Sequence, residues 1–348
     1  MSGQHRLVMS IITGAGVMGL AITSSLLMLA NYFVEQLSNP HGKLDAELNT
    51  WRLPQSEPEP PLSQQRALIF HTADGKLMRG DFWAQPHPAP TVIICHGYRV
   101  SRAYLRPVAA LEYKFGYNIL LFDFRGHGES ESVITSGGNA EVRDLEAALT
   151  VASQQPETLP GKVIIHGFSM GAAVALLAPP RSEVVAIIAD SPYARLDEVL
   201  RRVVCWELTR GSASWSPALR RLRRTFPALA WATVAVSRLV FRLRFGYALI
   251  ACPSLSFKRW QALSKKTPQR KHPPILLIHG MKDEAVPISH AYQIAKQARA
   301  CGITLETYLV EDTAHCDAYA HDPRGYIHVL QQFLALHLGM DFPTGRIA

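Results

Sequence analysis

A regular alternation of short apolar runs with segments of helical periodicity constrains the fold of this chain more than any other feature. Largely apolar runs of strand length occur at residues 91–97, 117–124, 162–168, 184–191 and 274–280, and residues 304–311 also have the pattern of a strand. Segments with helical patterns lie between or after them, at residues 101–116, 139–155, 170–178, 289–302 and 323–339. Because strands that are apolar throughout must be covered on both faces, this order predicts a mostly parallel sheet with helices on both sides. An Ala-Asp-Gly turn adds a β-hairpin at the start, between residues 66–72 and 76–85.

The sequence GFSMG, residues 167–171, lies at the junction of a predicted strand and a predicted helix. In this context the G-x-S-x-G pattern is typical of a sharp turn that exposes a serine hydroxyl at the carboxyl edge of the sheet. The small residues on either side let the backbone turn that tightly. The pattern therefore predicts Ser169 as a nucleophile, against the alternative of a Gly-Ser turn without chemistry.

A serine nucleophile requires a histidine base and a carboxylate that orients the histidine. Asp283 follows the strand at 274–280, and His315 follows the strand at 304–311. Both are expected at the edge of the sheet that carries Ser169, and the chain order Ser, Asp, His fits this fold. Alternatives remain at this stage, with His321 as a rival base and three rival acids, Asp190, Glu284 and Asp317.

Two backbone N–H groups must also stabilise the oxyanion of the tetrahedral intermediate. Met170, directly after the serine, is expected to supply one of them. The loop after residues 91–97 is expected to supply the other through the N–H of Tyr98. Arg99 is a candidate contact for an acidic substrate, against the plainer interpretation of a solvated arginine.

These segments together resemble the α/β-hydrolase superfamily, and within it the membrane-anchored or exported serine hydrolases of the serine-aminopeptidase and lysophospholipase-like branch. The resemblance covers about residues 66–340 and rests on five segments, CHGYRVSR, FDFRGHGES, GFSMG, HGMKDEAVP and AHCDAY. It implies an α/β-hydrolase fold and catalysis through an acyl-enzyme without a metal or organic cofactor. It also implies that Asp123, Arg125 and Gly126 are mainly structural. The chain departs from the simplest family pattern in a long basic insertion at about residues 192–272.

The amino-terminal segment contains no Lys, Arg, Asp, Glu or His from Leu7 to Val34. About 20 apolar residues suffice to cross a bilayer as a helix, so residues 1–34 are predicted to form an uncleaved membrane anchor. A cleaved signal peptide is the main alternative. The sequence GAGVMG at 14–19 matches the glycine spacing of a dinucleotide-binding turn, but no second strand with an acidic residue follows it. A proline-bearing linker, residues 35–65, and a tail, residues 341–348, complete the predicted domain organisation.

Charge is concentrated in the insertion. Residues 195–271 contain 17 Lys and Arg but only three acidic residues, whereas the whole chain carries a net charge of +8. This composition is compatible with a solvated helical surface, with a lid that faces anionic lipid, or with a site for acidic groups. No recognised nucleic-acid-binding motif accompanies it, so no nucleic acid partner is expected.

The sequence thus predicts a membrane-anchored serine hydrolase that cleaves a carboxylic ester, with thioester, lipid ester and amide substrates as alternatives. The short amino-terminal tail favours a catalytic domain outside the cytoplasm. A catalytically idle hydrolase fold that serves as a membrane-tethered binding module is the competing hypothesis, and an oxidoreductase using GAGVMG is the third.

Overall fold

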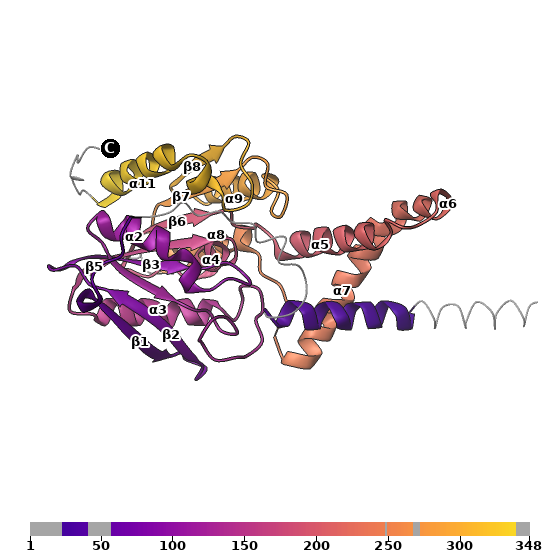
Figure 1. Cartoon of the computed structure of the whole chain (residues 1–348), viewed down its shortest axis with the longest axis horizontal. Helices are drawn as coiled ribbons and strands as arrows, with labels where there is room; N and C mark the ends of the chain where they lie inside the picture. Colours follow the sequence, from indigo (N-terminus) through magenta and orange to yellow (C-terminus); the bar gives the residue numbers. More distant parts are fainter. Residues whose placement is uncertain (1–22, 41–56, 248, 267–271, 339–348) are drawn as a thin grey trace, which may run out of the picture. The chain divides into compact units, whose positions relative to one another are not determined.

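The computed structural model describes residues 23–40, 57–247, 249–266 and 272–338 (Figure 1). The contacts of the chain divide it into two compact units. The first, called here the sheet unit, comprises Ser38–Leu196 and Ile250–Ala348. The second, called the helical unit, comprises Met1–Leu37 and Asp197–Leu249. The GAGVMG sequence and the tail at residues 341–348 lie outside the described residues.

The sheet unit is built on one eight-stranded sheet in the order β1-β2-β4-β3-β5-β6-β7-β8. The strands are β1 (Gln65–His71), β2 (Leu77–Trp83), β3 (Ala89–Cys95), β4 (Asn118–Phe122), β5 (Thr158–Phe168), β6 (Val184–Asp190), β7 (Ile275–Gly280) and β8 (Leu305–Val310). β2 pairs antiparallel with β1 and β4, and all other neighbours are parallel. The β1–β2 hairpin turns at Gly75, whose φ of 77° suits glycine. The predicted hairpin and mostly parallel sheet are confirmed.

Helices cover both faces of this sheet, as predicted (Figure 1). One face carries α3 (Val142–Gln154), α4 (Met170–Leu177), α8 (Pro253–Lys266) and α9 (Ser289–Ala300), whose buried side chains share one apolar core. The other face carries α2 (Arg106–Lys114) and α11 (Pro323–Leu338), which pack on a second core. Alternate residues of each strand supply the two cores, because successive side chains of a strand point to opposite faces. In β3, for example, Ile93 belongs to the first core and Ile94 to the second.

A buried arginine fixes the loop after β4. The side chain of Arg125 is 2% exposed and its guanidinium lies 2.7 Å from the carboxylate of Asp144 on α3 and 2.9 Å from that of Asp74. Two carboxylates thus compensate a cation that would be costly to bury alone. The loop is thereby tied to both the hairpin and α3.

The predicted basic insertion, residues 192–272, is shared between the two units. The helical unit takes only residues 197–249 of it, with α5 (Leu196–Gly211), α6 (Pro217–Arg220), the 3-10 turn η4 (Arg221–Thr225) and α7 (Phe226–Phe245). Its last part forms α8, which packs on the sheet because Phe257 and Trp260 are fully buried in the first core. The role of the insertion as a lid stays a prediction.

Residues 23–38 form a helix that packs within the helical unit. Ala30, Phe33 and Val34 are buried on one stripe, and the Ser237 hydroxyl of α7 donates a hydrogen bond to the Ala30 carbonyl over 3.3 Å. Among the described residues, one helical stretch, Pro217–Phe245, is long and apolar enough to cross a membrane, with a mean hydropathy of 1.3. Length and composition alone single it out, and it is internal rather than amino-terminal. The predicted anchor at residues 1–34 lies largely outside the described residues.

Candidate active site

Ser169 occupies the sharp turn between β5 and α4. Its φ of 50° and ψ of −110° are rare for a residue with a side chain, and strain of this kind gathers at functional sites. The two flanking glycines are required by close packing. A Cβ on Gly167 would lie 2.5 Å from the backbone nitrogen of Ala172, and one on Gly171 would lie 2.2 Å from the carbonyl oxygen of Cys95. The GFSMG sequence therefore follows from the space available to the backbone.

The structure brings the three predicted catalytic side chains together at the carboxyl ends of the parallel strands. The Nε2 atom of His315 lies 2.8 Å from the Ser169 hydroxyl, and its Nδ1 atom lies 2.6 Å from the Asp283 carboxylate. A carboxylate accepts hydrogen bonds, so the Nδ1–H donates to Asp283 and the Nε2 lone pair faces the serine. This tautomer is the one in which the imidazole can take the serine proton.

Asp283 is itself held in place. It is 5% exposed, and its Oδ1 atom accepts a hydrogen bond of 2.7 Å from the N–H of Val286. The Nε2 atom of His279 in β7 lies 3.4 Å from Oδ2 and donates to the Val286 carbonyl. Burial lowers the pKa of His279, so this histidine is neutral beside the carboxylate. Both Asp283 oxygens therefore have fixed partners.

Among the rival acids, Asp190 is fully buried and is bonded elsewhere. It accepts hydrogen bonds from the hydroxyls of Ser191, over 2.8 Å, and Tyr326, over 3.2 Å. The carboxylate that contacts Nδ1 of His315 is that of Asp283. The rival base His321 lies at the end of the short helix α10 (Ala318–His321). Sequence reasoning did not single out Ser191 or Tyr326, and no motif marks either of them.

The two expected oxyanion donors lie on segments that touch. Met170 begins α4 directly after the serine, and Tyr98 follows β3 by way of His96 and Gly97. The close approach of Gly171 to the carbonyls of Cys95 and His96 brings the two backbones together. His96 braces its loop, because its Nδ1 contacts the Gly97 carbonyl at 2.7 Å and its Nε2 accepts from the N–H of Phe124 at 2.9 Å. Burial lowers the pKa of His96 to about 4, so the ring is neutral.

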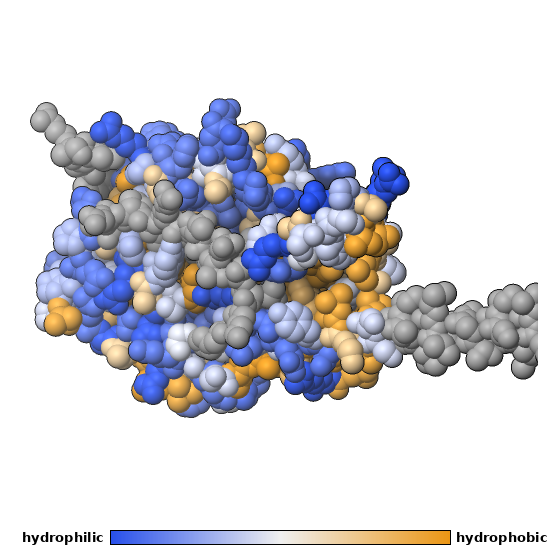
Figure 2. Space-filling view, turned by 45° about the vertical axis from the view of Figure 1, so that its right-hand side comes forward, coloured by the Kyte–Doolittle hydropathy of each residue, from blue (hydrophilic) through white to orange (hydrophobic). Residues whose placement is uncertain are grey.

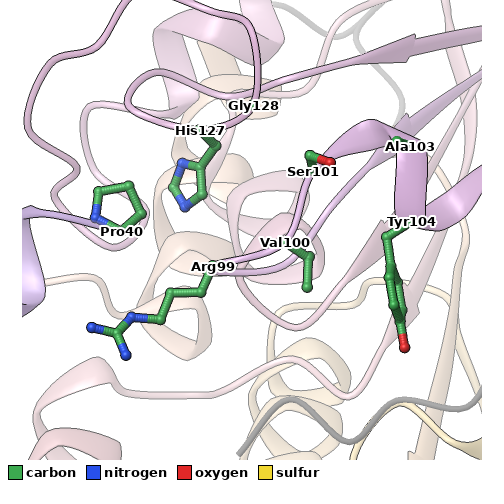
Figure 3. A pocket seen from close by; sticks show the side chains of 8 residues that line it. All are labelled: Pro40, Arg99, Val100, Ser101, Ala103, Tyr104, His127 and Gly128. Atoms are coloured by element: carbon green, nitrogen blue, oxygen red, sulfur yellow. The ribbon is translucent and has the colours of Figure 1, made fainter. Parts of the chain in front are cut away.

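The loop after Tyr98 contributes to a pocket of about 580 Å³ (Figure 3). It is lined by Pro40, Arg99, Val100, Ser101, Ala103, Tyr104, His127 and Gly128. Figure 3 shows Pro40, Arg99 and His127 on one side of it and Ser101, Ala103 and Tyr104 on the other. The pocket thus combines a cation, hydroxyl groups and apolar surface. Within the parts of the chain that the structure describes, no cluster of three or more His, Cys, Asp or Glu side chains is arranged to hold a metal ion.

A serine on a strand-turn-helix elbow, in chain order before an aspartate and a histidine on a mostly parallel sheet, defines the α/β-hydrolase class. The chain belongs to the alpha/beta hydrolase family, whose family model matches residues 92–329.

Several known proteins are similar to this chain. It is 27% identical over 275 residues to YqkD of Bacillus subtilis, a match that covers 78% of this chain and 79% of that protein. A shorter match, 32% identical over 110 residues, covers 31% of this chain and 35% of the thiohydrolase aneE of Aspergillus aculeatus. Among solved structures, the esterase Pf2001 of Pyrococcus furiosus has a TM-score of 0.58 at 24% identity, covering 83% of this chain and 100% of that one. At this identity the structural match establishes the fold alone, and together these findings support a hydrolase.

Proposed function

We propose that this protein is a serine hydrolase that cleaves a carboxylic ester, with Ser169 as nucleophile, His315 as general base and acid, and Asp283 as the residue that orients His315. The single observation that carries the proposal is the placement of the His315 ring, 2.8 Å from the Ser169 hydroxyl and 2.6 Å from Asp283. A binding module needs no such alignment.

The mechanism follows from the positions of these groups. Ser169 Oγ attacks the ester carbonyl while His315 Nε2 takes its proton, and the N–H groups of Tyr98 and Met170 stabilise the oxyanion. The imidazolium then protonates the leaving alcohol, which departs and leaves an acyl-enzyme. Water, deprotonated by His315, attacks the acyl carbon and releases the acid. Asp283 stabilises the imidazolium in both halves of the reaction.

Labelling with a fluorophosphonate probe tests the nucleophile. The parent should be labelled, Ser169→Ala should not, and Ser182→Ala, which removes an exposed serine away from the elbow, should be labelled like the parent. A folded parent that is not labelled would refute the proposal and favour the binding-module hypothesis.

The pocket lined by Arg99 is proposed to hold part of the substrate, because Arg99 directly follows Tyr98, an expected oxyanion donor, and the ring of His127 in its lining lies 5.8 Å from the ring of Tyr98. Replacing the exposed Ala103 by Trp places a large ring in this space without disturbing a buried residue. The variant should raise KM for bulky esters and leave acetate esters unaffected. A uniform effect on both would place the substrate elsewhere. Thioesters enter the same panel because one relative is named a thiohydrolase.

The protein is further proposed to be attached to a membrane through the uncharged run from Leu7 to Val34, with the catalytic domain outside the cytoplasm. The helical unit supports this through its surface, where Trp231 is 61% and Leu243 77% exposed among exposed arginines. In Figure 2 apolar surface in orange is scattered among hydrophilic surface in blue, with the most orange toward the right of the view. Such a mixture of apolar and cationic side chains suits an interface with anionic lipid.

Three measurements test the anchor, its orientation and the lipid contact of the helical unit. Resistance of the full chain to carbonate extraction tests the anchor, and protease accessibility in intact cells tests the orientation. Vesicles of phosphatidylglycerol should bind a variant carrying Arg→Gln at positions 220, 221, 224 and 242 more weakly than they bind the parent. Equal binding by both proteins would exclude a lipid contact through the arginines.

A further inference from the structure

A buried chain of hydrogen bonds, called here the relay, connects the loop that carries His315 to α2 on the second face of the sheet. The Cys316 N–H, next to His315, donates to the Ser191 hydroxyl over 3.1 Å, and that hydroxyl donates to Asp190 over 2.8 Å. The Tyr326 hydroxyl donates to the other Asp190 oxygen over 3.2 Å. The Nε2 atom of His166 lies 3.1 Å from the Tyr326 oxygen. The chain ends at Glu112, whose carboxylate lies 2.7 Å from the Nδ1 atom of His166.

Every side chain of this relay is fully buried. Glu112, His166, Asp190, Ser191 and Tyr326 each have 0% exposure. The surrounding core of α2, α11 and the strands is otherwise apolar. Burying carboxylates in such a core is costly unless they are hydrogen-bonded, and apolar side chains of similar size would fill the space at less cost. A polar relay in this place therefore calls for a role beyond packing.

Asp190 is hydrogen-bonded to the nucleophile turn at Ser169 and, through Ser191, to the loop that carries His315. Its backbone carbonyl accepts the Ser169 N–H over 2.8 Å, and its carboxylate reaches Cys316 through Ser191. Ser169, Ser191 and Cys316 also share a backbone feature, positive φ angles of 50°, 53° and 53°. Such conformations persist only where the surroundings hold them. The bonds to Asp190 and Ser191 supply that restraint on both sides of the reacting groups.

We propose that Asp190 is a second carboxylate for His315, which places the histidine through Ser191 and the Cys316 N–H and stabilises its imidazolium by charge, while Tyr326, His166 and Glu112 hold Asp190 in position. This inference rests on the proposed function, since it assigns positioning residues to that mechanism. Asp190 does not touch the substrate.

The protons of the relay can be assigned from its partners. Tyr326 has one hydroxyl proton and gives it to Asp190, so its oxygen accepts from the Nε2–H of His166. His166 Nδ1 and Glu112 then share one proton between them. Burial raises the pKa of Asp190 to about 6, although the hydrogen bond from Ser191 and the nearby rings of His166 and His315 oppose that rise. Above about pH 6 the relay therefore presents a carboxylate to His315.

The ionisable groups around His315 come from β6, β7 and the loops after β7 and β8. Asp283 and His279 belong to β7 and the loop after it, Asp190 ends β6, and the Cys316 thiol follows the histidine itself. Burial raises the pKa of that thiol, so it carries no charge here. Asp190 is faced in turn by His166 of β5 and by Tyr326 of α11, with Glu112 of α2 behind them. Asp190 and Asp283 are thus the carboxylates whose loss should change the titration of His315.

The test compares Asp190→Asn, Tyr326→Phe and the control Tyr319→Phe, which removes a hydroxyl from the neighbouring ring at 5.2 Å. Asp190→Asn should lower kcat by roughly tenfold or more, since an ionised partner near imidazolium is lost. It should also move the acidic limb of kcat/KM to lower pH, because the imidazolium of His315 becomes less stable and its pKa falls. Tyr319→Phe should leave both unchanged.

Tyr326→Phe distinguishes an effect of the Asp190 charge from a purely structural role of Tyr326. Losing one donor raises the pKa of Asp190 further, so the defect should be largest near pH 6 and fade at high pH, where Asp190 is ionised again. A loss that is equal at every pH would indicate only a structural role and overturn the proposal. Tyr326→Phe also carries the test if Asp190→Asn does not fold.

An NMR titration of the His315 ring gives a readout independent of turnover. A lower His315 pKa in Asp190→Asn supports the inference even if the fluorophosphonate probe fails to label Ser169, which would refute only the proposed function. An unchanged His315 pKa in a folded Asp190→Asn variant, with Ser169 labelled, overturns the inference and leaves the proposed function standing.

Discussion

Replacing Asp283 by Asn should disable the site without altering its shape. Asp283 offers one oxygen to His315 Nδ1 at 2.6 Å and the other to the Val286 N–H at 2.7 Å. An asparagine with its NH₂ toward the Val286 N–H sets two donors against each other, which costs about 1–3 kcal/mol. The opposite orientation turns the NH₂ toward Nδ1. The proton of His315 then moves to Nε2, where it faces the Ser169 hydroxyl at 2.8 Å and blocks proton transfer.

The expected loss of kcat combines the misoriented hydrogen bonds with the loss of the negative charge beside His315. A hydrogen bond to a charged partner contributes about 1.5–3 kcal/mol, so both effects together reach about 2.5–6 kcal/mol. At 1.36 kcal/mol for each factor of ten, kcat should fall roughly 10²- to 10⁴-fold. Rates of ester hydrolysis and of fluorophosphonate labelling measure the loss. The control is Asp312→Asn, in the loop that carries His315, because Asp312 is 71% exposed and pairs with Lys282 at the surface. If Asp283→Asn kept activity within tenfold of the parent, Asp283 would not be the orienting acid.

Three further variants test the surroundings of the site. Ser169→Gly should abolish labelling yet raise the thermal midpoint of unfolding by a few degrees, because glycine relieves backbone strain of about 1–3 kcal/mol. Differential scanning calorimetry measures the midpoint, and an unchanged or lower value would contradict the inferred strain. Gly171→Ala should give little soluble protein, since its Cβ would lie 2.2 Å from the Cys95 carbonyl oxygen, and normal expression would show that the loop can retreat. Arg125→Met should cost about 3–5 kcal/mol in denaturant unfolding by leaving Asp144 buried without its partner. Burial raises the pKa of Asp144 to about 7 in the parent, and removing the Arg125 cation raises that pKa further. Below about pH 6 the folded parent and the folded variant both carry the proton, so the loss should grow only as pH rises above about 7. A loss that is the same at about pH 6 and about pH 9 would exclude Asp144 as its source.

The sequence determined the sheet and its helices because their signals are local. A strand buried on both faces is apolar at most positions, and the runs at 91–97 and 274–280 show this directly. GFSMG is local as a sequence pattern, and Gly167 is required by contacts within the turn itself, whereas Gly171 is required by the carbonyl of Cys95 in β3, a strand distant in the sequence. Where the insertion returns to the sheet is not visible in the sequence, because α8 is basic on its exposed side, whereas the burial of Phe257 and Trp260 decides where it packs.

Choices among several similar residues needed the tertiary structure. Asp190 and Asp283 both follow apolar strands, and no residue near either in the sequence says which reaches Nδ1 of His315. The bond to Asp283 and the engagement of Asp190 with Ser191 and Tyr326 depend on where β6, β7 and α11 lie in space. The relay shows the same limit, because its members are up to 214 residues apart in the chain, at positions 112 and 326. A sequence records the spacing of residues along one dimension, whereas a hydrogen bond depends on distance and direction in three.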